Sequence, residues 1–225
     1  MKNKTLTIML TLLMSMAASV ASAYDALING IYYNFDQTEG VATVTKGSYS
    51  GDVIIPESVI YDNVTYSVTY IDYYAFRGCT DMTSIIIPNS VISIGDYAFS
   101  GCSGLKELTI EDGDNTLSIG CNKYYTYNDN GYGEGLFCEC PLTTVYLGRN
   151  LSYHASRRYG YSPFYNKSSL NSVTIGNRVT VIGDNAFYEC TGLISITIPD
   201  GVICIGEYNQ EIKGETNMEI IPVSA

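Results

Sequence analysis

The side chains that could carry out catalysis are few and scattered along the chain. His154 is the single histidine, so any Ser-His-Asp or Cys-His arrangement would have to use it. It lies among arginines and tyrosines, and no nucleophile motif surrounds it. Hydrolysis by a carboxylate pair needs two acids that converge in a cleft, whereas the acids here are dispersed. The residue types therefore predict that the protein is not an enzyme and holds no cofactor.

Metal ligands are equally sparse. The chain has seven cysteines but no C-x-x-C pair, and with one histidine this argues against a zinc site. The acidic or amide-rich stretches 111–115 and 128–130 are the places where calcium could bind. Neither stretch has the spacing of an EF-hand loop, and the first is typical of a turn. No metal site is therefore predicted.

A repeat organises most of the chain. An Ala-Phe-x-x-Cys element recurs with its phenylalanines at Phe76, Phe99 and Phe187, and the first two lie 23 residues apart. Residues 84–88 and 195–199 are near copies of one I-P-terminated strand, and each is followed by V-x-x-I-G. The unit reads L-x-x-I-x-I-P-x-x-V-x-x-I-G-x-x-A-F-x-x-C. Self-similarity of this kind predicts stacked structural units that cannot fold alone.

The unit has a direct structural interpretation. The I-x-I alternation predicts a strand with one buried face, and the glycines Gly95, Gly120, Gly183 and Gly206 are expected where the chain turns sharply. Four cysteines share one repeat position and should point into the core as small hydrophobic residues, namely Cys79, Cys102, Cys140 and Cys190. A disulfide between Cys121 and Cys138 stays an open alternative.

This pattern resembles the 23-residue leucine-rich repeat of bacterial BspA-type surface proteins, over residues 65–206. The resemblance implies a leucine-rich-repeat solenoid with a parallel β-sheet on the concave face and short helical or irregular turns outside. It also implies a secreted or surface-exposed protein, since some members of the family are linked to adhesion to host proteins. It implies no catalytic residues.

The segments outside the repeats complete the predicted organisation. Residues 1–23 form a signal peptide, with Lys2 and Lys4 before an apolar run and a small-x-small site at residues 21–23. Residues 24–50 are expected to form an N-terminal β-hairpin cap, residues 51–206 the repeats, and residues 207–225 a C-terminal cap or tail. The mature protein is expected outside the cell or on its surface, with the periplasm as the remaining possibility.

Charge excludes two classes of partner. Removal of Lys2 and Lys4 leaves ten basic residues against 23 acidic ones, a net charge of −13. Such a chain repels nucleic acids and anionic membranes because it has no basic stripe to neutralise phosphates. No segment after the signal peptide is apolar enough for membrane insertion.

Function is most readily sought where the repeat is interrupted, at about residues 121–135 and 152–162. Leu105 and Leu142 are 37 residues apart, 14 more than the period, and Leu142 and Leu170 are 28 apart. Both insertions are rich in tyrosine, which offers a large contact area at low entropic cost. Neutral surface insertions are the alternative. The predicted binding residues are Tyr124, Tyr125, Tyr127, Tyr132, Tyr153, Arg157, Arg158, Tyr159 and Tyr161.

The outward positions of the strands offer a second candidate site. They hold a Ser/Thr-rich ladder that could bind a glycan, although threonine also favours strands for steric reasons. The ladder comprises Thr83, Ser84, Thr109, Thr143, Thr144, Tyr146, Ser172, Thr174, Ser195 and Thr197. The sequence thus predicts a non-catalytic module for adhesion to a host or bacterial surface protein, with a carbohydrate-binding module as the alternative.

Overall fold

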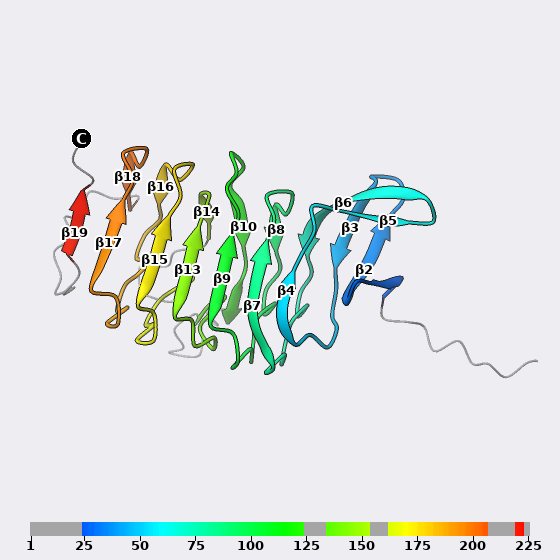
Figure 1. Cartoon of the computed structure of the whole chain (residues 1–225), viewed down its shortest axis with the longest axis horizontal. Coiled ribbons are helices and arrows are strands. Elements are labelled where there is room, and N and C mark those ends of the chain that lie inside the picture. The colour runs from blue at the N-terminus through cyan, green and yellow to red at the C-terminus, as the bar shows by residue number, and fades with distance from the viewer. Residues whose placement is uncertain (1–23, 124–133, 154–161, 207–218, 223–225) are drawn as a thin grey trace, which may run out of the picture.

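The computed structural model describes residues 24–123, 134–153, 162–206 and 219–222, and all regular structure within them is β-strand. Figure 1 shows these strands side by side along the long axis of the molecule, in two layers. Each repeat makes one coil, which runs along one layer, turns, and returns through the other. Because the described residues contain no helix, none of them forms a helical membrane span.

The front layer is a seven-stranded sheet in which every pair of neighbours is parallel. Its strands come from the I-x-I segment of each repeat, and the isoleucines of the alternation point inward, as in Ile85 and Ile87. The front sheet consists of β4 (Gly51–Ile54), β7 (Met82–Ile87), β9 (Glu107–Ile110), β13 (Thr144–Leu147), β15 (Ser172–Ile175), β17 (Ser195–Ile198) and β19 (Glu219–Pro222).

The rear layer is built from the V-x-x-I-G segments, which form a second parallel ladder of short strands. Two strands farther along, β16 (Val181–Ile182) and β18 (Cys204–Ile205), pair separately. The main rear sheet consists of β1 (Ala26–Ile28), β2 (Ile31–Asp36), β3 (Val41–Val44), β5 (Ser58–Tyr61), β6 (Val64–Ile71), β8 (Ser93–Ile94), β10 (Leu117–Ile119) and β14 (Leu151–Ser152).

The solenoid of stacked parallel strands is confirmed, and so are irregular turns outside the front sheet, as at residues 73–78 and 97–101. The described residues contain no helix, and they add a second strand ladder on the side away from the front sheet. The remaining Ala-Phe-x-x-Cys segment forms a tight turn, in which the Cys79 amide donates to the Phe76 carbonyl at 3.0 Å. A single four-residue turn closed by one such i→i+3 hydrogen bond is too short to form a helix.

Three hairpins lie at the N-terminal end of the described residues. β1 and β2 pair antiparallel across residues 29–30, β2 and β3 pair antiparallel around the 36–41 turn, and β3 then pairs in parallel with β6 of the rear sheet. β5 and β6 form the third hairpin, whose turn residues Asp62 and Asn63 have φ of 49° and 61°. Two consecutive positive φ angles are typical of the type I′ turn, whose twist suits paired strands. The meander β1–β2–β3 therefore covers the edge of the rear sheet, while β4 is the outermost strand of the front sheet.

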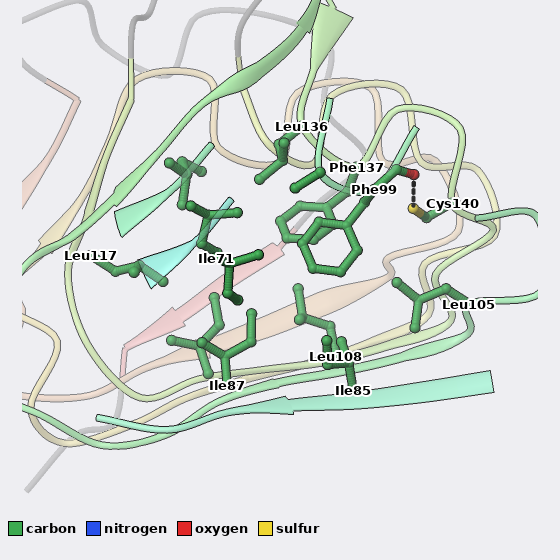
Figure 2. Close-up of a cluster of buried hydrophobic side chains, with 14 of the residues drawn as sticks. Ile71, Ile85, Ile87, Phe99, Leu105, Leu108, Leu117, Leu136, Phe137 and Cys140 are labelled. Carbon is green, nitrogen blue, oxygen red and sulfur yellow. Dashed lines mark hydrogen bonds between the residues drawn. The ribbon is translucent and has the colours of Figure 1, made fainter. Parts of the chain in front are cut away.

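The core lies between the layers and is closed on its third side by stacked phenylalanines. Figure 2 shows Ile85, Ile87 and Leu108 of the front strands opposite Ile71 and Leu117 of the rear strands. Successive ring centroids lie 5.1, 4.9, 5.8 and 5.4 Å apart, within the range of favourable aromatic pairs. The stack consists of Phe76, Phe99, Phe137, Phe164 and Phe187.

The glycines of the V-x-x-I-G element are needed for close packing of coils more than for a sharp turn. Gly95 does not have a positive φ, and a Cβ on it would lie 2.7 Å from the Tyr73 amide nitrogen of the preceding coil. Of the four glycines assigned to turns, Gly206 alone has a left-handed φ, at 77°. Packing of one backbone against the next therefore explains glycine at position 95.

Candidate functional site

The two insertions fall largely outside the described residues. Eight of the nine predicted binding residues lie there, and so do His154 and the 128–130 stretch. Those eight are Tyr124, Tyr125, Tyr127, Tyr132, Arg157, Arg158, Tyr159 and Tyr161. Tyr153 is the ninth and lies at the point where the second insertion begins.

Tyr153 is tied to the following coil. Its side chain is half-buried against the core, and its hydroxyl donates to the Asp184 carbonyl at 2.8 Å. The ring lies over Gly183, where a Cβ would come within 2.5 Å of the tyrosine hydroxyl oxygen. Tyr153 thus anchors the start of the second insertion on the next coil.

The points at which the two insertions leave the solenoid are adjacent. β10, which precedes the first insertion, pairs in parallel with β14, which precedes the second. In this register Ser118 lies opposite Ser152. Because neighbouring strands lie about 4.8 Å apart, both chains depart from the same region of the rear sheet.

The points of return are adjacent as well. The first insertion returns at Gly135, and a Cβ on this residue would overlap the carbonyl oxygen of Ser162, where the second insertion returns. Ser162 in turn donates its hydroxyl to the Asn185 carbonyl at 2.6 Å. All four ends of the insertions are therefore gathered at neighbouring coils.

A polar cluster fixes the base of the first insertion. β11 (Cys121–Lys123) and β12 (Glu134–Gly135) pair antiparallel across it. The buried Asn122 donates its amide to Cys138 Sγ at 3.0 Å, and the Cys138 thiol lies 3.4 Å from Glu134 Oε2. Burial raises the pKa of Cys138 to about 12, so it is a protonated, unreactive thiol at neutral pH. Cys121 and Cys138 are both free thiols.

The same base is bound to the coils on both sides. Glu139 Oε2 accepts a hydrogen bond from Ser100 Oγ at 2.9 Å and another from the Gly101 amide. Burial would raise the pKa of Glu139, but these hydrogen bonds outweigh it and hold the pKa below its usual value. On the other side, Lys167 donates from Nζ to the carbonyls of Cys138 and Cys140.

Lys167 takes the place that cysteine has in the other repeats. It lies three residues after Phe164, as Cys79 lies three after Phe76. Burial lowers the pKa of Lys167, and its two carbonyl acceptors compensate for the lost hydration of the ammonium group. The sequence interpretation missed this repeat because Pro163 and Lys167 replace the alanine and the cysteine that marked it.

The repeat cysteines are core residues, as predicted. Cys102 donates its thiol to the Phe76 carbonyl at 3.0 Å, and Cys190 donates to Phe164 at 2.9 Å. Cys140 makes the equivalent contact with the Phe99 carbonyl, drawn as a dashed line in Figure 2. The thiols of Cys102 and Cys140 thus donate a second hydrogen bond to carbonyls that already close a turn, and so tie each coil to the preceding one, which is a structural role.

The outward ladder of the front sheet is partly occupied by contacts within the chain. Thr83 and Ser84 both donate their hydroxyls to Asp52 Oδ1, at 2.8 and 2.7 Å, and these bonds lower the pKa of Asp52. Tyr146 donates to Asp112 Oδ1 at 2.8 Å. The positions that face solvent most openly are Thr144, Ser172, Thr174, Ser195 and Thr197.

The acidic turn at 111–115 is likewise engaged. Asp112 accepts the Tyr146 hydroxyl, and Asp114 forms an exposed ion pair with Arg178 at 3.1 Å. Among the described residues no three potential metal ligands lie together.

Comparison with protein families shows where the repeat pattern recurs. The model of the BspA type leucine-rich repeat region matches residues 57–157 and 157–211, with six copies. No match was found among curated protein sequences.

Several solved bacterial structures are similar. A leucine-rich repeat protein from Treponema pallidum has a TM-score of 0.50 at 21% identity, over 79% of each chain. A leucine-rich repeat protein from Bacteroides ovatus has a TM-score of 0.46 at 23% identity and covers 88% of this chain. A leucine-rich cell surface protein from Faecalibacterium prausnitzii has a TM-score of 0.42 at 23% identity and covers 80% of this chain. The present chain spans 58% of the length of the Bacteroides ovatus protein and 50% of the Faecalibacterium prausnitzii protein.

Proposed function

Because the chain belongs to the BspA-type leucine-rich repeat family, we propose that it is a non-catalytic binding module that recognises a protein through its two Tyr-rich insertions. The repeats supply a rigid scaffold, and the insertions supply the side chains that differ from coil to coil. Insertions in repeat proteins commonly gather on one face, which is often the binding face.

One observation carries this proposal. The insertions leave from paired strands and return at residues in contact, Gly135 and Ser162. Two loops whose starting points are adjacent and whose end points are adjacent can present their side chains to one ligand more readily than loops on distant coils. The polar cluster around Asn122 fixes the two ends of the first insertion. These ends therefore lose little conformational entropy when a ligand binds.

The composition of the insertions favours a protein as ligand. Tyrosine and arginine are enriched at protein interfaces, where aromatic rings bury large areas and guanidinium groups donate in several directions. The insertions contain seven tyrosines and two arginines among the predicted binding residues. We infer that the partner is a protein on a host or bacterial surface.

Export follows from the proposed signal peptide. Lys2 and Lys4 precede an apolar run that ends in a small-x-small site at residues 21–23. This pattern supports a location outside the cytoplasm, on the cell surface or beyond it, where such a partner would be met.

Replacement of residues 124–133 by a short Gly/Ser linker tests the proposal. The strands β11 and β12 should be kept, because Cys121 and Asn122 are buried. Both forms would be measured by biolayer interferometry against a panel of extracellular-matrix and bacterial surface proteins. We expect the intact chain to bind a protein and the replaced chain to lose at least about tenfold in affinity.

A matched control is Ile60→Ser, which removes an exposed apolar side chain from β5, in the N-terminal part of the molecule. It should leave protein binding unchanged. Equal binding by the intact and replaced chains, with both folded by circular dichroism, would contradict the assignment of the first insertion to recognition.

A further inference from the structure

A cavity of about 380 Å³, open to solvent, lies on the rear sheet, and its β10 residues Ser118 and Ile119 come just before the first insertion. Residues of β3, β6, β8 and β10 line it, together with the turn that follows β6. Its volume is in the range of sites for small ligands, about 300–1,000 Å³.

One wall of the cavity is a row of hydroxyl groups in strand register. Thr43 pairs with Tyr70, Tyr70 with Ser93, and Ser93 with Ser118. These residues alternate with buried ones such as Ile71 and therefore face away from the core. Neighbouring strands lie about 4.8 Å apart, so these four residues recur at that interval along the backbone, with the ring of Tyr70 between the shorter side chains of Thr43 and Ser93.

Asp72 and Tyr73 border this row. The Tyr73 amide donates to Asp72 Oδ1 at 2.8 Å, which fixes the carboxylate at the edge of the cavity. In the described part of the chain nothing donates to Asp72 Oδ2 and nothing bonds to the Tyr73 hydroxyl, while the Tyr73 side chain is 59% exposed. The backbone of Asp72 and Tyr73 packs closely against Gly95, so this turn lies in contact with the next coil.

We propose that this cavity binds a saccharide with a neutral or amino-bearing ring. A sugar offers hydroxyl groups that both donate and accept, and the row at Thr43, Ser93 and Ser118 has the same dual capacity. The carboxylate of Asp72 accepts from two sugar hydroxyls or from an ammonium group. The exposed ring of Tyr73 provides an apolar face for the carbon side of the sugar.

Charge narrows the class of saccharide. Asp72 and Asp96 line the cavity, and the whole chain has a net charge of −11. Sialic acids and uronic acids would therefore be repelled, whereas neutral and amino sugars would not. The site differs from the Ser/Thr ladder of the front sheet, where the hydroxyls of Thr83 and Ser84 already bind Asp52.

Isothermal titration of residues 24–225 with cellobiose, chitobiose and its de-N-acetylated form tests this inference, with a sialylated lactose as the anionic control. We expect at least one neutral or amino sugar to bind with Kd of about 1 mM or tighter. Asp72→Asn and Tyr73→Ala should each weaken that binding at least about tenfold, because each removes a direct contact.

The matched control is Thr174→Val with Thr197→Val, which removes two exposed hydroxyls from the front sheet and should leave sugar binding intact. Circular dichroism establishes that each variant is folded. Three results would overturn the proposal: no sugar binds, the sialylated sugar alone binds, or binding is indifferent to both rear-sheet substitutions. Protein recognition through the insertions uses other residues, so its success or failure does not decide this test.

Discussion

Gly135 packs directly against the carbonyl oxygen of Ser162, so the residues at which the two insertions rejoin the solenoid are in contact. Any side chain at position 135 would force these coils apart. The absence of a side chain at position 135 therefore allows the C-terminal ends of the two insertions to lie in contact.

The first prediction concerns that contact. Gly135→Ala should lower the free energy of unfolding by about 1–3 kcal/mol, because the added methyl group overlaps backbone that has little freedom to move. Urea denaturation measures the change. Gly201→Ala is the control, since a Cβ there would lie 3.3 Å from its nearest neighbour, Asn177 O. Equal effects of the two substitutions would show that the coils are not in contact at Gly135.

A second prediction concerns Arg149, whose side chain is fully buried. It donates to the carbonyls of Pro88 and Asn89 at 2.8 and 2.9 Å, and burial lowers its pKa. Arg149→Ala removes the side-chain donor of the Asn89 carbonyl, leaves the Pro88 carbonyl with the Val91 amide alone and opens a cavity, so we expect a loss of about 2–4 kcal/mol of stability.

Arg178 is the matched control for Arg149. Its exposed ion pair with Asp114 should contribute less than about 1 kcal/mol, so Arg178→Ala should have little effect on the urea midpoint. A stability loss from Arg149→Ala no larger than that from Arg178→Ala would be inconsistent with a buried guanidinium.

Alkaline pH supplies a third prediction. Burial raises the pKa of Tyr33 from 10.0 to about 12, so the folded chain keeps a proton that the unfolded chain releases. The stability from the neutral phenol is fully present below pH 10 and is lost as the pH rises through about 12. The free energy of unfolding should fall across this window, and Tyr33→Phe should make the fall shallower. An unchanged pH dependence in the variant would be evidence against burial of this hydroxyl.

Cysteine reactivity supplies a fourth prediction. Iodoacetamide should label Cys204 in the native protein, because its side chain is exposed, while the repeat cysteines should react only after denaturation. Peptide mass spectrometry distinguishes the sites. The protected set is Cys79, Cys102, Cys140 and Cys190. Rapid native labelling of Cys102 or Cys140 would mean that the turn carbonyls do not bind these thiols as described.

The parts of the fold that could be predicted from the sequence are those in which one residue type serves one purpose in every coil. The spacing of Phe76 and Phe99 identified the repeat, and the alternation at Ile85 and Ile87 identified the front strands. The shared cysteine position predicted buried thiols for the same reason. Each of these contacts repeats with the same chemistry, so the pattern is visible without the structure.

The rest depends on contacts between coils that the pattern does not record. Strands of two residues, such as β8, are too short to show alternation, so the rear ladder was not predicted. Lys167 and Arg149 are charged residues of types that are ordinarily exposed, and carbonyls of other coils stabilise them in the interior. The rear cavity could not be predicted because its wall consists of residues far apart in sequence. Only the pairing of the rear strands brings them side by side.

The central claim is that both insertions contact one ligand, and a double-mutant cycle tests it most directly. Tyr127→Ala, Tyr159→Ala and the double variant would each be titrated with the protein ligand found by the panel. If both insertions contact the ligand, each single substitution should weaken binding, and the double variant should weaken it further; a departure from additivity of about 0.5–3 kcal/mol would show that the two tyrosines share partner groups. No loss of affinity from one or both of the single substitutions would contradict a shared recognition surface.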